Sequence, residues 1–190
     1  HDRKPLPLLN FLCFAHGSLE TYKEVIKMPD VLMQEVFQGA VDRALRDVMP
    51  RVAGIALLQG GPPPAGEVYT VHTVFEGDTN ADLSMCADAA VFTRLTQRIT
   101  QQEQIAQEDL ADAAKELFNV FCGHIAVDLF RTAKLTLRFQ IPQFSKGRQI
   151  PSGHIWLFTL NYRGDRNESI QVIHHARADL EPLDRVRPSA

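Results

Sequence analysis

The sequence predicts an α/β protein in which helices pack on a largely antiparallel sheet. The first observation is the order of periodic segments along the 190 residues: one helix, two strands, two helices and three strands. The second is that short turns containing glycine join neighbouring strands as hairpins. The third is composition: 45% of the residues are apolar and 23% are charged, as in globular proteins with a sizeable core.

The first helix and a hairpin are predicted between residues 30 and 75. Asp30 is a candidate N-cap, apolar residues then recur at helical spacing, and Pro50 is expected to end the helix. Residues 51–59 form a short apolar run, which is typical of a strand. A loop at 60–66 follows, and 68–75 alternates and is rich in β-branched and aromatic residues. We therefore expect 51–59 and 68–75 to pair as a hairpin.

Two helices are predicted in the middle of the chain, separated by a polar junction at 101–107. The second starts near Glu108-Asp109, where acidic side chains suit the positive end of the helix dipole. The first spans 81–101 and has apolar residues at helical spacing, namely Leu83, Cys86, Ala89, Ala90, Phe92 and Leu95.

Three strands are predicted in the last third of the chain, at 134–139, 155–162 and 169–176. Residues 145–148 are interpreted as a loop, and 163–167 as a turn.

The predicted domain spans residues 30–178, with an N-terminal extension at 1–29 and a tail at 179–190. An apolar run at 6–15 is interpreted as a strand or arm, because Pro7 and Asn10 break it and no small-residue cleavage site follows. No apolar run reaches the 18 or so residues that span a bilayer. Three cysteines without metal spacing indicate buried free thiols in a reducing compartment. We expect a cytoplasmic protein without a membrane segment.

Several kinds of site are not supported by the sequence. The net charge of −3 and the isoelectric point near 6.2 give no sign of a nucleic-acid-binding patch. No Gly-x-Ser-x-Gly nucleophile elbow is present. His174 and His175 lie in an apparent edge or terminal strand with side chains on opposite faces, so they cannot chelate one metal together. No metal site is expected.

The most informative stretch is a helix that begins near Asp112. At about 100° per residue, Glu116 and Asn119 lie within about 40° of Asp112 on the helical wheel. The angular position of Gly123 falls between those of Glu116 and Asn119. Any amphipathic helix has a polar face, so this pattern alone does not indicate a function. The opposite pole of the wheel is apolar and consists of Leu110, Ala114, Leu117, Phe121 and Ile125.

Asp112-x3-Glu116-x2-Asn119, with Gly123 after it and Pro142 downstream, resembles the signature of the CheC/CheX/FliY family of chemotaxis phosphatases. The resemblance covers about residues 30–178 and implies a CheX-like fold with one motif. The segment 81–101 has no second Glu-x-x-Asn copy, so a two-site, CheC-like protein is not supported.

The resemblance implies that the chain dephosphorylates a phospho-aspartyl receiver domain of the CheY type. Asn119 would orient the attacking water, and Glu116 would pair with the lysine beside the receiver's phosphoaspartate. Gly123 would let the partner backbone approach. Asp112 would be a supporting residue in an early turn, where a carboxylate suits the helix dipole, and Pro142 would shape a strand end.

The resemblance also implies a homodimer, for which the sequence offers unpaired strand edges. Mg²⁺ would belong to the receiver, and the chain itself would hold no cofactor. The alternative is a non-catalytic signalling module that binds a receiver or another partner through the same helix face. Burial of Glu116 or Asn119 would favour this alternative.

Overall fold

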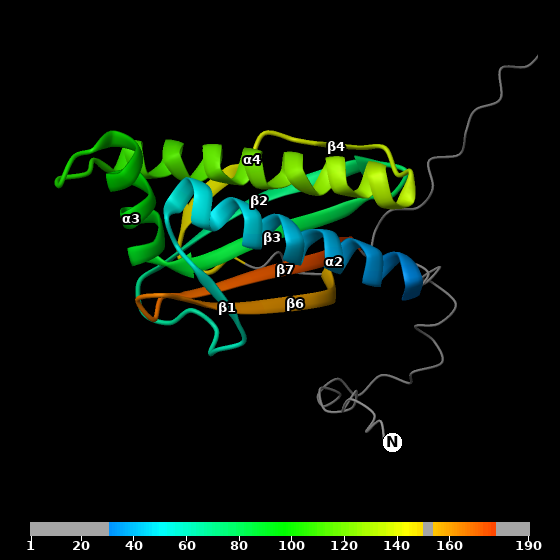
Figure 1. Cartoon of the computed structure of the whole chain (residues 1–190), viewed down its shortest axis with the longest axis horizontal. Helices are drawn as coiled ribbons and strands as arrows, with labels where there is room; N and C mark the ends of the chain where they lie inside the picture. Colours follow the sequence, from blue (N-terminus) through cyan, green and yellow to red (C-terminus); the bar gives the residue numbers. More distant parts are fainter. Residues whose placement is uncertain (1–30, 150–153, 178–190) are drawn as a thin grey trace, which may run out of the picture. The chain divides into compact units, whose positions relative to one another are not determined.

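The computed structural model of the chain describes residues 31–149 and 154–177, which belong to one compact unit. In the described part of the chain, three α-helices pack on one antiparallel sheet, as predicted, and Figure 1 shows α2 and α4 lying across it. The predicted extension at 1–29, the cap at Asp30 and the tail at 179–190 lie outside the described residues. In chain order the elements are α2 Val31–Val48, a π-helical turn at Met49–Ala53, β1 Leu57–Gln59, β2 Val68–Gly77, β3 Ala81–Asp88, α3 Ala89–Thr100, α4 Gln107–Ala133, β4 Leu137–Phe139, β5 Gln143–Lys146, β6 His154–Gly164 and β7 Ser169–Arg177.

The strand order in the described sheet is β1-β6-β7-β3-β2-β4, with β5 also paired to β2. Its central strand, β3, is buried along most of its length. Leu83 and Met85 join the core under the helices, whereas Ser84 and Cys86 are buried on the other face. The core therefore lies between the three helices and one face of the sheet.

The α-helix ends at Val48, next to Pro50 as predicted, but the chain stays helical through the π-helical turn at Met49–Ala53, in which Pro50 occupies the first turn. A proline removes the i→i−4 hydrogen bond and its ring clashes with the carbonyl of residue i−4, so regular α-helix cannot continue through it. The turn ends at Gly54, whose φ of 67° favours glycine. The strand predicted at 51–59 consequently shrinks to β1.

The predicted hairpin of 51–59 with 68–75 is wrong. β1 pairs with β6, and β2 pairs with β3, β4 and β5. The helix predicted over 81–101 is a helix only from Ala89, because residues 81–88 form β3. A strand buried on both faces lacks the apolar-polar alternation that identifies half-buried strands. In addition, β5 occupies part of the predicted loop at 145–148.

The histidine pair lies on β7, the last described strand, which is not the edge strand that was one of the two predicted alternatives, since β7 is paired on one side to β3 and on the other to β6. The His174 ring stacks on Phe37 of α2 with 4.5 Å between centroids and also contacts Phe158. Burial, with a smaller contribution from His175, lowers the pKa of His174 to about 3. His174 is therefore a neutral core residue at physiological pH.

The two cysteines in the described part of the chain are free, as predicted. Cys86 and Cys122 are both buried. Burial raises the pKa of each thiol, so neither is activated as a nucleophile. Cys13 lies outside the described residues.

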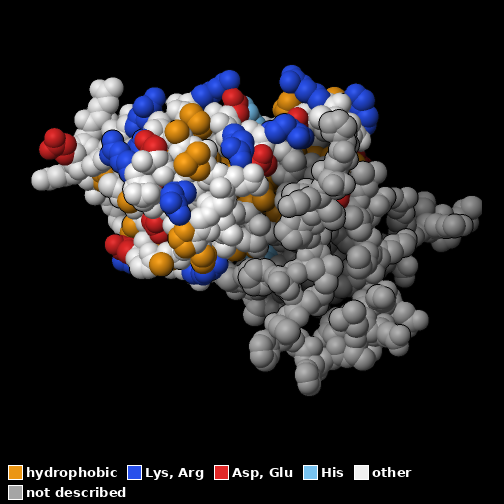
Figure 2. All heavy atoms as spheres, turned by 60° about the horizontal axis from the view of Figure 1, so that its bottom comes forward, with side chains coloured by type: hydrophobic (Ala, Val, Ile, Leu, Met, Phe, Trp, Pro, Cys, Tyr) orange, Lys and Arg blue, Asp and Glu red, His pale blue; other side chains and the backbone are white. Residues whose placement is uncertain are grey.

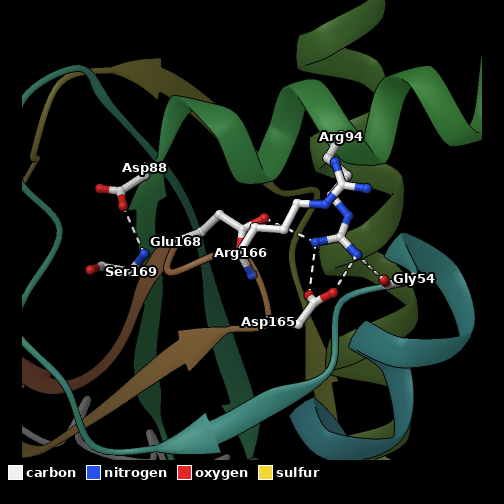
Figure 3. A network of polar contacts seen from close by, with 7 residues as sticks. All are labelled: Gly54, Asp88, Arg94, Asp165, Arg166, Glu168 and Ser169. Carbon is white, nitrogen blue, oxygen red and sulfur yellow. Dashed lines mark hydrogen bonds and ion pairs between the residues drawn. The ribbon is translucent and has the colours of Figure 1, made fainter.

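A polar network ties the β6–β7 turn to α3 and to the end of the π-helical turn (Figure 3). Arg94 of α3 binds both oxygens of Asp165 at 2.8 and 3.0 Å, reaches Glu168 at 3.0 Å and donates to the carbonyl of Gly54. The Glu168 side chain is only 5% exposed. The hydrogen bond and charge of Arg94 hold the pKa of Asp165 below its usual value. Arg94 is thus the only cation among the described residues that pairs with the buried carboxylate of Glu168.

No helix in the described part of the chain is both long and apolar enough to cross a membrane. The face in Figure 2 shows positive and negative side chains interspersed around apolar ones.

Candidate functional site

Helix α4, which spans 27 residues, carries the predicted motif. Its core side packs against α2, α3 and the sheet, and the five residues predicted for its apolar pole are all buried there. Because one side of this long helix is fixed in the core, the opposite side is a rigid platform for side chains that face solvent.

Glu116 and Asn119 lie on the solvent side of α4. Glu116 is exposed and Asn119 is half-buried. Residues three apart on a helix have Cβ atoms about 5–6 Å apart, so the two side chains are neighbours. Neither forms a hydrogen bond or an ion pair with any described residue. The carboxylate and the carboxamide are therefore both open to a partner.

Asp112 and Pro142 have other surroundings. Asp112 is exposed and pairs with Lys115 of the same helix at 2.7 Å. Pro142 is buried between β4 and β5, two strands that lie against α4 (Figure 1). Phe139 pairs with Phe75 of β2, and Gln143 pairs with His72 of β2. The β4–β5 segment therefore has one more residue than β2 between these two pairs, and the regular pairing is interrupted at Pro142. A proline fits this point because it has no N–H to donate to a ladder.

Gly123 lies one turn beyond Asn119, in the middle of α4. A Cβ atom added to it would meet nothing within 4 Å, and its φ is not in the left-handed region. Glycine inside a helix costs about 0.5–1 kcal/mol relative to alanine. Packing in the described residues therefore gives no reason for a glycine at this position.

A groove between α2 and α4 adjoins the motif face, with a volume of about 550 Å³. Two polar contacts cross it: the ion pair of Arg43 with Asp128 at 2.6 Å and the contact of His124 Nδ1 with Asp47 at 3.3 Å. Sequence spacing gave no signal for this groove, since each pair joins residues about eighty positions apart. The residues that line it are Arg43, Ala44, Asp47, Gly123, His124, Val127, Asp128 and Arg131.

The described residues contain no group of three His, Cys, Asp or Glu side chains placed to hold a metal ion. The groove and the motif face instead offer a carboxylate, a carboxamide and several cations around an open helix. This arrangement can bind and orient a polar group or a water molecule, but it contains no nucleophile that would form a covalent intermediate.

Comparison with known proteins shows which family part of this chain resembles. The model of the family described as "Chemotaxis phosphatase CheX" matches residues 69–155. The resemblance to CheX is confirmed. The matched segment of this CheX-like chain contains Asp112, Glu116, Asn119, Gly123 and Pro142, although the match assigns no role to any of them. A search of curated proteins found no match.

Solved structures share the fold at low sequence identity. A chemotaxis protein CheX from Desulfovibrio desulfuricans is 16% identical with a TM-score of 0.59, covering 73% of this chain and 97% of its own. CheX in a complex with CheY, BeF₃ and Mg²⁺ from Borrelia burgdorferi is 18% identical with a TM-score of 0.57, covering 75% and 96%. FliY from Thermotoga maritima is 13% identical with a TM-score of 0.54, covering 82% and 92%. The CheX-like fold predicted from the sequence is thus confirmed.

Proposed function

We propose that this CheX-like chain is a phosphatase that hydrolyses the phosphoaspartate of a CheY-type receiver domain. Glu116 and Asn119 carry the activity, and the match to the CheX family supports it. The observation on which the proposal rests is that these two side chains are adjacent, accessible and unengaged by described residues on one rigid helix.

Asn119 is proposed to position the attacking water. Hydrolysis of an acyl phosphate requires a water in line with the scissile P–O bond, and positioning supplies most of the catalysis. A carboxamide can donate and accept hydrogen bonds, so it can hold a water without adding negative charge beside the phosphoryl group. The buried side of α4 fixes the backbone from which Asn119 projects, and this limits the motion of the water that it holds.

Glu116 is proposed to bind the lysine that lies beside the phosphoaspartate in receiver domains. The exposed carboxylate has no described cation of its own, so it is available for an intermolecular ion pair. Such a pair orients the receiver with its phosphoryl group next to Asn119. Asp112, already paired with Lys115, and the buried Pro142 support the helix and the adjoining strand end without touching the substrate.

The magnesium ion in this proposal belongs to the receiver, where carboxylates and the phosphoryl oxygens would hold it. The Borrelia burgdorferi structure, which contains CheX, CheY and Mg²⁺ together, supports a receiver as the partner. Receiver signalling would place the chain in the cytoplasm. A homodimer would use the open edges of the sheet, where β1 exposes 68% of Leu58.

Gly123 provides a test with two opposite effects. Gly123→Ala should raise the free energy of unfolding by about 0.5–1 kcal/mol, because alanine loses less conformational entropy than glycine in a helix and no described atom lies within 4 Å of the added methyl group. The same variant should slow dephosphorylation, and Gly123→Leu should slow it further, because the side chain keeps the receiver away from the helix. Urea unfolding and phosphate release measure the two effects.

Thr132→Leu adds comparable bulk near the end of the same helix and should leave the phosphatase rate unchanged. Full activity in Gly123→Leu would show that no partner approaches α4 at this point.

The proposal as a whole is tested by phosphate release from purified receiver domains that have been phosphorylated with a small-molecule phosphodonor. Substoichiometric amounts of this chain should accelerate the decay of at least one receiver from the same cell. A receiver that binds tightly but decays at its spontaneous rate would instead support the non-catalytic signalling module.

A further inference from the structure

We propose that the receiver also docks on the C-terminal half of α4, where Val127 and Phe130 form an apolar anchor and Arg131 receives an acidic group. This inference rests on the proposed function and adds a second contact region to it. Val127 is 50% exposed and Phe130 is 55% exposed.

These two residues continue the motif face of α4. Val127 follows Gly123 by four residues and Phe130 follows Val127 by three, so all three lie on one stripe of the helix. Large apolar side chains this exposed are few among the described residues, the others being Leu58, Ile99 and Ile141. One face of α4 therefore carries polar side chains before Gly123 and apolar side chains after it.

A receiver domain centred on the motif is large enough to reach Val127 and to approach Phe130. At a rise of about 1.5 Å per residue, Val127 and Phe130 lie about 12 and 16 Å along the axis from Asn119. A small domain is about 30 Å across and reaches about 15 Å to each side of its contact point. Specific interfaces bury about 800 Å² on each partner, much more than Glu116, Asn119 and Gly123 can provide.

Charge favours the C-terminal half of α4 over the N-terminal half. The rim of a phosphorylated receiver site is anionic, because it combines a phosphoryl group with the carboxylates that hold magnesium. The first turn of α4 carries Glu108 and Asp109, which repel such a rim. Arg131 lines the groove at the other end and has no ion pair with a described residue, whereas Arg43 is neutralised by Asp128.

The test uses the full chain and a receiver carrying beryllium trifluoride and magnesium as a stable phosphoryl mimic. Val127→Glu/Phe130→Ser should raise Kd for this receiver by roughly tenfold or more, as expected for an apolar anchor. It should raise KM for dephosphorylation similarly and leave kcat unchanged, because Glu116 and Asn119 stay in place. Arg131→Glu should raise Kd and reduce the dependence of Kd on salt concentration.

Ile99→Glu is the matched control, since Ile99 is also 50% exposed on a helix. It should leave Kd and KM unchanged. If the Val127/Phe130 variant still accelerates dephosphorylation and its Kd and KM are unchanged, the docking surface is refuted and the proposed phosphatase activity stands. Failure of every receiver to bind would overturn both the docking surface and the phosphatase. A change in sedimentation of that variant without the receiver would show that the stripe contacts a second copy of this chain, which also overturns the inference.

Discussion

Asn119→Ala is expected to reduce the accelerated dephosphorylation of a phosphorylated receiver by roughly 100-fold or more, to a rate near the spontaneous one. The variant removes the carboxamide that would hold the water, and no other described side chain on this face replaces it. Asn119 is half-buried and its side chain forms no hydrogen bond with a described residue, so the free energy of unfolding should change little.

The binding readout separates chemistry from docking. Asn119→Ala should bind the receiver carrying beryllium trifluoride with nearly unchanged Kd, because Glu116 and the rest of α4 remain. Gln107→Ala is the matched control: it removes the same functional group from the exposed first residue of the helix and should retain the full rate. A normal rate of phosphate release in Asn119→Ala would refute the proposed mechanism.

Arg94→Ala is expected to have the largest effect on stability, lowering the free energy of unfolding by about 3–5 kcal/mol. The variant leaves the buried carboxylate of Glu168 with no charged partner and removes the hydrogen bond to the Gly54 carbonyl. It also frees Asp165, so the β6–β7 turn loses its attachment to α3 (Figure 3). Urea unfolding at pH 7 measures the loss.

Two comparisons make the cause specific. Arg98→Ala removes an exposed arginine one turn further along α3 and should cost no more than about 0.5 kcal/mol of the free energy of unfolding.

Arg94 holds the folded-state pKa of Asp165 below its unfolded value, so this ion pair contributes to stability above pH about 4, and the contribution is lost as the pH falls. The difference between wild type and Arg94→Ala should therefore narrow in acid. If the difference in the free energy of unfolding between wild type and Arg94→Ala stays constant down to pH 3, the Arg94–Asp165 ion pair does not contribute to it.

The motif and the apolar pole of α4 were predicted from the sequence because both are local. A helix repeats every 3.6 residues, so the spacing of Asp112, Glu116, Asn119 and Gly123 fixes the face that they share. The same periodicity identified α2. In both helices one side packs in the core as the pattern predicts.

The errors fall where local pattern and tertiary environment differ. Residues 81–88 have apolar residues at a spacing that suits a helix, yet they form the central strand. Burial on both faces removes the alternation by which a strand is recognised. The α-helix ends next to Pro50 as predicted, but a π-helical turn follows it, so the strand predicted from residue 51 begins only at Leu57.

The sequence by itself determined which side chains of α4 can act together, since their angular positions depend only on helix geometry. Tertiary structure alone decided that Glu116 and Asn119 stay accessible, that no packing contact requires Gly123 to be small, and that Arg43 and Asp128 close one side of a groove. These properties depend on which elements pack beside α4. Contacts between residues far apart in the chain set that arrangement, and the periodicity of one segment carries no information about them.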